Sequence, residues 1–155
     1  TRLLANRLGM RQVWARILSV YGPYDGENSM VMSAITALLE GRIPKFTAGE
    51  QLWDYLYSED AARALLLVAE EDGTAAFILS AAGKRGPERV YFSHSGGRDE
   101  NAEVAIGAVP YPSGQVMNLA ADISALKKET GWTPRVPFEE GIQTTVTWVK
   151  NLRNA

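Results

Sequence analysis

The chain has 155 residues, of which 46% are hydrophobic and 22% charged, a composition typical of one soluble globular domain. Its formal net charge of -2 at pH 7 gives no electrostatic reason to expect binding to nucleic acid or to an anionic membrane, and no apolar run approaches the roughly 20 residues that span a bilayer. Cysteine is absent, which excludes disulfides, thiolate catalysis and Cys-ligated metals and fits the cytoplasm, where we expect the protein.

The first elements predicted are the end of a helix and a buried strand. Residues 2–8 carry leucines at helical spacing, and Gly9 is suited to end that helix. Residues 13–20 form an apolar run typical of a buried strand, which Gly22 and Pro23 terminate. Because the chain begins without Met inside a helical pattern, we expect a piece of a longer protein.

The middle of the chain alternates between helices and short strands. Ser29 is placed to cap a helix that runs to about Glu40. A short strand and a loop are expected over 42–53, and a strand over 55–57. Ser58 then caps a helix over 59–71.

The last third is less regular. Residues 75–82 fit either a helix or a strand, and 89–92 fit a strand. Prolines and glycines predict a loop over 107–114. A short helix is expected over 122–131, because Asp122 can cap it and Gly131 can end it, and a final helix over 138–152. This alternation of strands and helices predicts the α/β class.

Four segments carry motifs in a fixed order. They are Ala-Arg-Ile-Leu-Ser-Val-Tyr-Gly-Pro at 15–23, Gly-Glu-Gln-Leu-Trp-Asp-Tyr followed by Ser-Glu-Asp-Ala-Ala-Arg-Ala within 49–64, Ala-Asp-Ile-Ser with Thr-Gly-Trp-Thr-Pro within 121–134, and Phe-Glu-Glu-Gly-Ile at 138–142. Together they resemble the extended short-chain dehydrogenases/reductases of the NAD-dependent epimerase/dehydratase family. The resemblance covers most of the chain, and residues 73–105 match least.

The resemblance implies the last part of a Rossmann-like parallel sheet followed by a small C-terminal substrate-binding lobe. Residues 1–28 would complete the dinucleotide-binding domain, and 29–155 would form mainly the substrate lobe. The implied function is the C-terminal half of an NAD-dependent nucleotide-sugar epimerase or dehydratase. The implied cofactor of the full-length relative is NAD(P).

The residues that perform chemistry in this family are absent from this chain. No Gly-x-x-Gly-x-x-Gly turn occurs to hold the pyrophosphate of a dinucleotide, and no Tyr is followed four residues later by Lys. We therefore expect no catalytic residue, no metal ligand, no activity from this chain alone and no cofactor bound to it. Whether the chain functions as part of an enzyme is left open.

Candidate ligand contacts follow from the family pattern, because ligands bind beyond the carboxyl ends of parallel strands. The substrate- or cofactor-proximal candidates are Ser19, Val20, Tyr21, Gln51, Trp53, Tyr111 and Gln115. Trp53 and Pro112 stand where many relatives have phosphate-binding arginines, which weakens the case for a diphosphate ligand. The Trp53 ring is suited either to stack on a base or sugar or to fill the core.

Two further groups of residues favour structural interpretations. His94 is the only histidine and fits a turn, while Asp99, Glu100 and Glu103 match no metal-ligand spacing and fit a solvated acidic turn.

The alternative function is a non-catalytic binding or protein-interaction module derived from such an enzyme. The partners expected are a nucleotide sugar and either the missing N-terminal half or further copies of the chain, because an unpaired sheet edge favours self-association.

Overall fold

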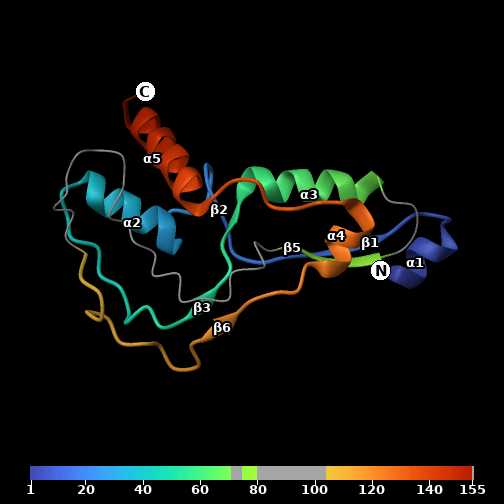
Figure 1. The fold of residues 1–155 in the computed structure, drawn as a ribbon, viewed down its shortest axis with the longest axis horizontal. Coiled ribbons are helices and arrows are strands. Elements are labelled where there is room, and N and C mark those ends of the chain that lie inside the picture. The colour runs from blue at the N-terminus through green and yellow to red at the C-terminus, as the bar shows by residue number, and fades with distance from the viewer. Residues whose placement is uncertain (71–74, 80–103, 155) are drawn as a thin grey trace.

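The computed structural model describes residues 1–70, 75–79 and 104–154, an α/β arrangement of short parallel strands and helices (Figure 1). The elements, in chain order, are α1 (Arg2–Arg7), β1 (Val13–Ile17), β2 (Val20–Tyr21), α2 (Met30–Leu39), β3 (Leu52–Trp53), β4 (Leu56–Tyr57), α3 (Ser58–Glu70), β5 (Ala75–Leu79), β6 (Asn118–Leu119), α4 (Ser124–Thr130) and α5 (Phe138–Asn154). A helix and a strand were both possible for 75–82, and strand β5 confirms the strand over the described part, Ala75–Leu79. The strand expected over 89–92, His94 and the acidic turn lie outside the described residues.

The strands form three parallel pairs, β1 with β5, β2 with β4 and β3 with β6. The single strand predicted over 13–20 is wrong, because the chain breaks at Ser19, whose φ of 44° is left-handed. The break changes the pairing partner from β5 before it to β4 after it. The Ser19 carbonyl still accepts a hydrogen bond from Leu56 N at 3.1 Å, so the β2–β4 pairing begins at the break.

One buried cluster joins α2 and α5 to the strands β2 and β4. Helix α2 begins where Ser29 Oγ accepts from Met32 N at 3.2 Å, as its capping role predicts. The apolar faces of α2 and α5 pack around Tyr21 and Tyr57. Its buried members are Tyr21, Val31, Met32, Ala34, Ile35, Tyr57, Ile142, Val146 and Val149.

A second buried cluster joins α3 and α4 to β1 and β4. It consists of Leu56, Ala61, Ala64, Val68, Leu126 and Trp132. The half-buried Val13 and Ala15 of β1 pack against it, so α3 covers one face of that strand (Figure 1). Helix α4 ends at Gly131, whose φ of 68° is the left-handed conformation that a glycine adopts without strain.

The Asp60 carboxylate ties α3 to the segment that leads into α5. It is 2% exposed, and its Oδ2 accepts from the backbone N–H groups of Arg135 at 2.8 Å and Val136 at 2.9 Å. Arg63 pairs with Oδ1 of the same carboxylate and donates to the Thr133 carbonyl at 2.8 Å. Each carboxylate oxygen therefore has a donor, which a buried charge requires.

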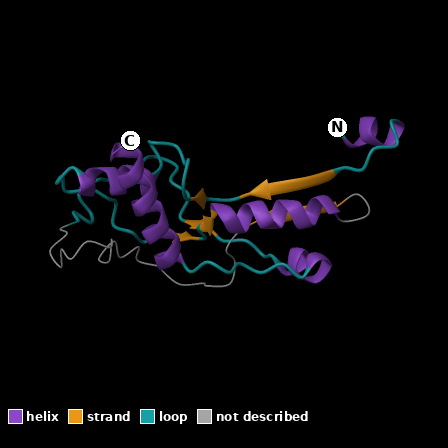
Figure 2. Cartoon of the chain, turned by 90° about the horizontal axis from the view of Figure 1, so that it is seen from above, coloured by secondary structure: helices purple, strands orange, loops and turns teal. Residues whose placement is uncertain are grey.

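The N-terminal end projects from the rest of the molecule. Helix α1 has no buried residue and lies apart from the other helices (Figure 2). Trp14 and Ile17 of β1 are also half exposed, although Val13 and Ala15 are packed. Among the described residues, no helix is both long enough and apolar enough to cross a bilayer.

Replacing Asp60 by Asn will lower the free energy of unfolding by about 1–3 kcal/mol, because the new amide turns a donor toward one of the existing donors. Thermal or urea unfolding measures this loss. Glu59→Gln is the matched control, since Glu59 is exposed in the same helical turn and its loss costs at most about 1 kcal/mol through the helix dipole. Equal losses in the two variants would contradict the role given to Asp60.

Replacing Gly141 by Ala will destabilise the chain by about 1–3 kcal/mol, although alanine is the better helix former. The added Cβ would lie 2.2 Å from the Tyr21 hydroxyl oxygen and 2.9 Å from Tyr57 Cδ2. Gly26→Ala is the control, because nothing lies within 4 Å of its Cβ and its φ is not positive. Urea unfolding of both variants tests this, and a stabilised Gly141→Ala protein would refute the close packing.

Candidate functional site

Three of the predicted site residues lie together where β1 passes into β2. Ser19 is half buried and makes the left-handed turn described above. Val20 packs against the α3–α4 cluster. Tyr21 is 2% exposed. Of these three residues, only Ser19 has a backbone conformation that departs from regular strand geometry. It lies two residues beyond the carboxyl end of β1.

Tyr21 is a core residue that positions α5. Its hydroxyl donates to the Phe138 carbonyl at 3.2 Å, and its ring centroid lies 5.0 Å from that of Phe138 and 5.6 Å from that of Tyr57. Gly141 lets the α5 backbone approach the hydroxyl. The side chain of Tyr21 thus sets how the start of α5 packs against β2 and β4.

Burial keeps the tyrosines beside Tyr21 protonated. It raises the pKa of Tyr55 to about 12, and the pKa of Tyr57 is also raised, chiefly by burial and further by Glu59. For a tyrosine to act as a general base near neutral pH, the pKa of its phenol must be lowered, not raised. These two tyrosines are therefore suited to packing and not to proton abstraction.

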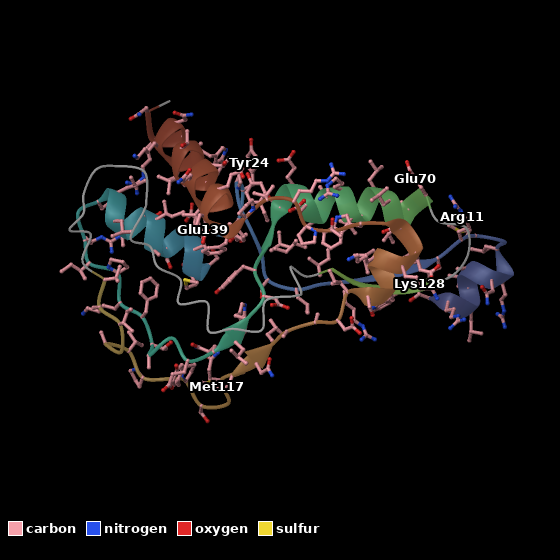
Figure 3. The ribbon with its side chains drawn as sticks, in the orientation of Figure 1. Arg11, Tyr24, Glu70, Met117, Lys128 and Glu139 are labelled. Atoms are coloured by element: carbon pink, nitrogen blue, oxygen red, sulfur yellow. The ribbon has the colours of Figure 1, made fainter. Side chains whose placement is uncertain are left out.

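The other four predicted site residues lie on a ribbon made of two distant segments. Residues 44–54 run beside 104–119, joined by a bridge between Lys45 and Ala105 and by the β3–β6 pair (Figure 1). Backbone bonds from Leu52 N to the Met117 carbonyl and from Asp54 N to the Leu119 carbonyl, at 2.9 and 3.0 Å, fix the register. Met117 marks this edge of the molecule in Figure 3.

A side-chain cluster links the two segments of the ribbon. The Tyr111 hydroxyl accepts from Glu50 N at 3.0 Å and donates to Gln51 Oε1 at 3.4 Å. Gln51 Nε2 in turn donates to Thr47 Oγ1 at 3.3 Å. The structure thus brings together Gln51 and Tyr111, which lie 60 positions apart in the sequence.

Trp53 and Gln115 complete the ribbon without joining this cluster. Trp53 is half buried and is the last residue of β3, two residues after Gln51. Gln115 is half buried and donates through Nε2 to the neighbouring Val116 carbonyl at 3.0 Å. Within the described ranges, no group of three or more His, Asp or Glu side chains is placed to hold a metal ion.

Sequence reasoning missed two features of this region. Thr47 was not singled out, and its only signal is its place four residues before Gln51 on an extended segment. The contact made by Asp54 was not predicted either: it accepts from Ala121 N at 3.0 Å, which fastens β3 to the segment after β6. A contact between such distant segments leaves no local pattern.

The N-terminal half of the chain, residues 1–77, matches the family described as NAD dependent epimerase/dehydratase. Over 137 residues the chain is 34% identical to dTDP-glucose 4,6-dehydratase of Salmonella typhimurium, which covers 83% of this chain and 38% of that protein. The chain therefore spans less than half the length of this curated relative.

Solved structures have the same fold. UDP-N-acetylglucosamine 4-epimerase of Methanobrevibacter ruminantium, in complex with UDP-N-acetylmuramic acid, superposes with a TM-score of 0.83 at 26% identity, over 97% of this chain and 50% of that one. UDP-glucose 4-epimerase of Thermus thermophilus, in complex with NAD, gives a TM-score of 0.78 at 21% identity, over 96% of this chain and 50% of that one.

These likenesses confirm the α/β, Rossmann-like fold class and the resemblance read from the four sequence motifs. They also confirm that full-length relatives use NAD, since a solved relative contains it. The chain belongs to the NAD-dependent epimerase/dehydratase family of extended short-chain dehydrogenases/reductases.

Proposed function

We propose that this chain is the C-terminal, sugar-nucleotide-binding part of an NAD-dependent nucleotide-sugar epimerase or dehydratase. The observation that carries the proposal is the likeness of almost the whole chain to about half of a nucleotide-sugar epimerase. The position of Ser19 at the carboxyl end of β1 supports it, because ligands of open parallel sheets bind beyond such ends. In this proposal residues 1–28 complete the dinucleotide-binding domain and 29–155 form mainly the substrate lobe.

The chain alone is proposed to be inactive. Its sequence has neither the Gly-rich turn that would hold a dinucleotide pyrophosphate nor a Tyr followed four residues later by Lys. The residues present therefore do not fit NAD by themselves. Tyr55 and Tyr57, with their raised pKa values, are not substitutes for a catalytic base.

The exposed N-terminal end supports a partner that covers it. Its exposed apolar side chains are Leu3, Leu4, Leu8, Met10, Trp14 and Ile17. We propose that the remaining half of such an enzyme, or further copies of this chain, covers this surface. The same surface favours the second candidate function, a non-catalytic interaction module derived from such an enzyme.

A thermal-shift titration tests nucleotide-sugar binding. UDP-glucose or dTDP-glucose is expected to raise the melting temperature of the chain, and NAD to leave it unchanged. A ligand that binds only the folded state adds about 2.7 kcal/mol of stability at a hundred times its Kd. A shift with NAD alone, or detectable turnover by the purified chain, would contradict the proposal, and no shift with any of these ligands would favour the interaction module.

A further inference from the structure

The strand β1 has one paired edge and one open edge. Within residues 1–70, 75–79 and 104–154, β1 pairs with β5 alone, in a sheet of two strands. As far as these residues go, the other edge carries backbone N–H and C=O groups that no strand pairs, and β1 lies along the border of the molecule (Figure 2). Such an edge is a template for pairing with another chain.

The two faces of β1 differ in what covers them. Val13 and Ala15 are half buried and pack against the cluster between α3 and α4. Trp14 and Arg16 alternate with them and are exposed, Trp14 at 55%. Ile17, at the end of the strand, is 50% exposed. A strand that pairs with the open edge therefore has an aromatic, a cationic and an aliphatic side chain within reach.

The sequence of β1, Val-Trp-Ala-Arg-Ile, is complementary to itself about its central residue. In an antiparallel pair with a two-fold axis at Ala15, Trp14 lies opposite the partner's Arg16, and Val13 lies opposite the partner's Ile17. Opposite residues have Cβ atoms about 4.5–5.5 Å apart, so a guanidinium can stack on the indole and the two aliphatic side chains can touch. The axis repeats each contact, and it closes the assembly at two copies because both copies use the same edge.

Neighbouring registers lack this complementarity. An axis at Arg16 would place two guanidinium groups opposite each other, which is destabilising. An axis at Trp14 would place Arg16 opposite the partner's Gln12 and leave both indoles without a cation. Because the arrangement centred on Ala15 pairs the side chains better than the arrangements on either side of it, the register is specified by the strand itself.

We infer that the open edge of β1 binds the same edge of a second copy of the chain, which gives an antiparallel, two-fold dimer centred on Ala15. The inference goes beyond the proposed function, because no nucleotide or sugar takes part in the pairing. It identifies the contact between copies that covers the exposed residues of β1. The remaining half of an enzyme would compete with the second copy for this edge.

Sedimentation of the purified chain over a range of concentrations tests the register through an exchange of charges. Trp14→Lys sets a lysine opposite the partner's Arg16 on both sides of the axis, so it is expected to raise the dimer Kd by about tenfold or more. Adding Arg16→Glu to that variant sets the new lysine opposite a new glutamate, and is expected to return Kd to within about threefold of its original value. Ile106→Lys and Lys128→Glu are the controls, since both residues are exposed and lie outside β1.

A disulfide tests the position of the two-fold axis directly, because the chain has no cysteine of its own. Opposite residues of antiparallel strands have Cα atoms about 4.5–5.5 Å apart, inside the range that a disulfide spans. Ala15→Cys places a thiol on the axis, so in oxidising buffer two copies are expected to join at least about tenfold faster than two copies of Ala48→Cys. Ala48 is exposed and lies outside β1. Both variants keep Trp14 and Arg16, so this result does not depend on how well the charge variants fold.

The outcomes decide this inference separately from nucleotide-sugar binding. A chain that stays monomeric up to high micromolar concentration, or assemblies that keep growing with concentration, would overturn it. A double variant that dimerises no better than Trp14→Lys, or equal rates of disulfide formation in the two cysteine variants, would also overturn it. The thermal-shift titration with UDP-glucose or dTDP-glucose tests the proposed function whichever of these results is obtained.

Discussion

The Asp60 carboxylate is the constraint on which the rest of the arrangement depends. A buried carboxylate is stable only when donors surround it, and here the donors come from Arg63 on its own helix and from the backbone of Arg135 and Val136. The Asp60 carbonyl also accepts from Trp132 Nε1 at 3.2 Å. One residue thus holds the whole segment between α4 and α5 against the start of α3.

From that junction the positions of α5 and of the strands it covers follow in turn. Fixing the segment before α5 sets where the helix begins, and Gly141 then lets it close onto Tyr21. Tyr21 belongs to β2, which pairs with β4, and β4 begins three residues after Trp53, the last residue of β3.

The sequence predicted what local chemistry determines. Helix α2 was expected because Ser29 can cap a segment whose apolar residues recur at helical spacing. The end of α4 was expected because Gly131 can adopt a positive φ. The break at Ser19 and the contact of Gln51 with Tyr111 could not be predicted, because each depends on a distant segment: β4 for the break and the 104–119 side of the ribbon for the contact. Family motifs located Gln51 and Tyr111 separately but carried no information about their contact.

The parallel strand pairs have a consequence for how the chain acquires its structure during synthesis. Each described pair joins segments separated by at least one helix, so few native contacts form between neighbours in sequence. Proteins dominated by such distant contacts fold slowly, since loop closure is required before pairing stabilises anything. A ribosome releases Asp60 long before Arg135, so the backbone donors of Arg135 and Val136 reach the carboxylate only after a further 75 residues have been synthesised.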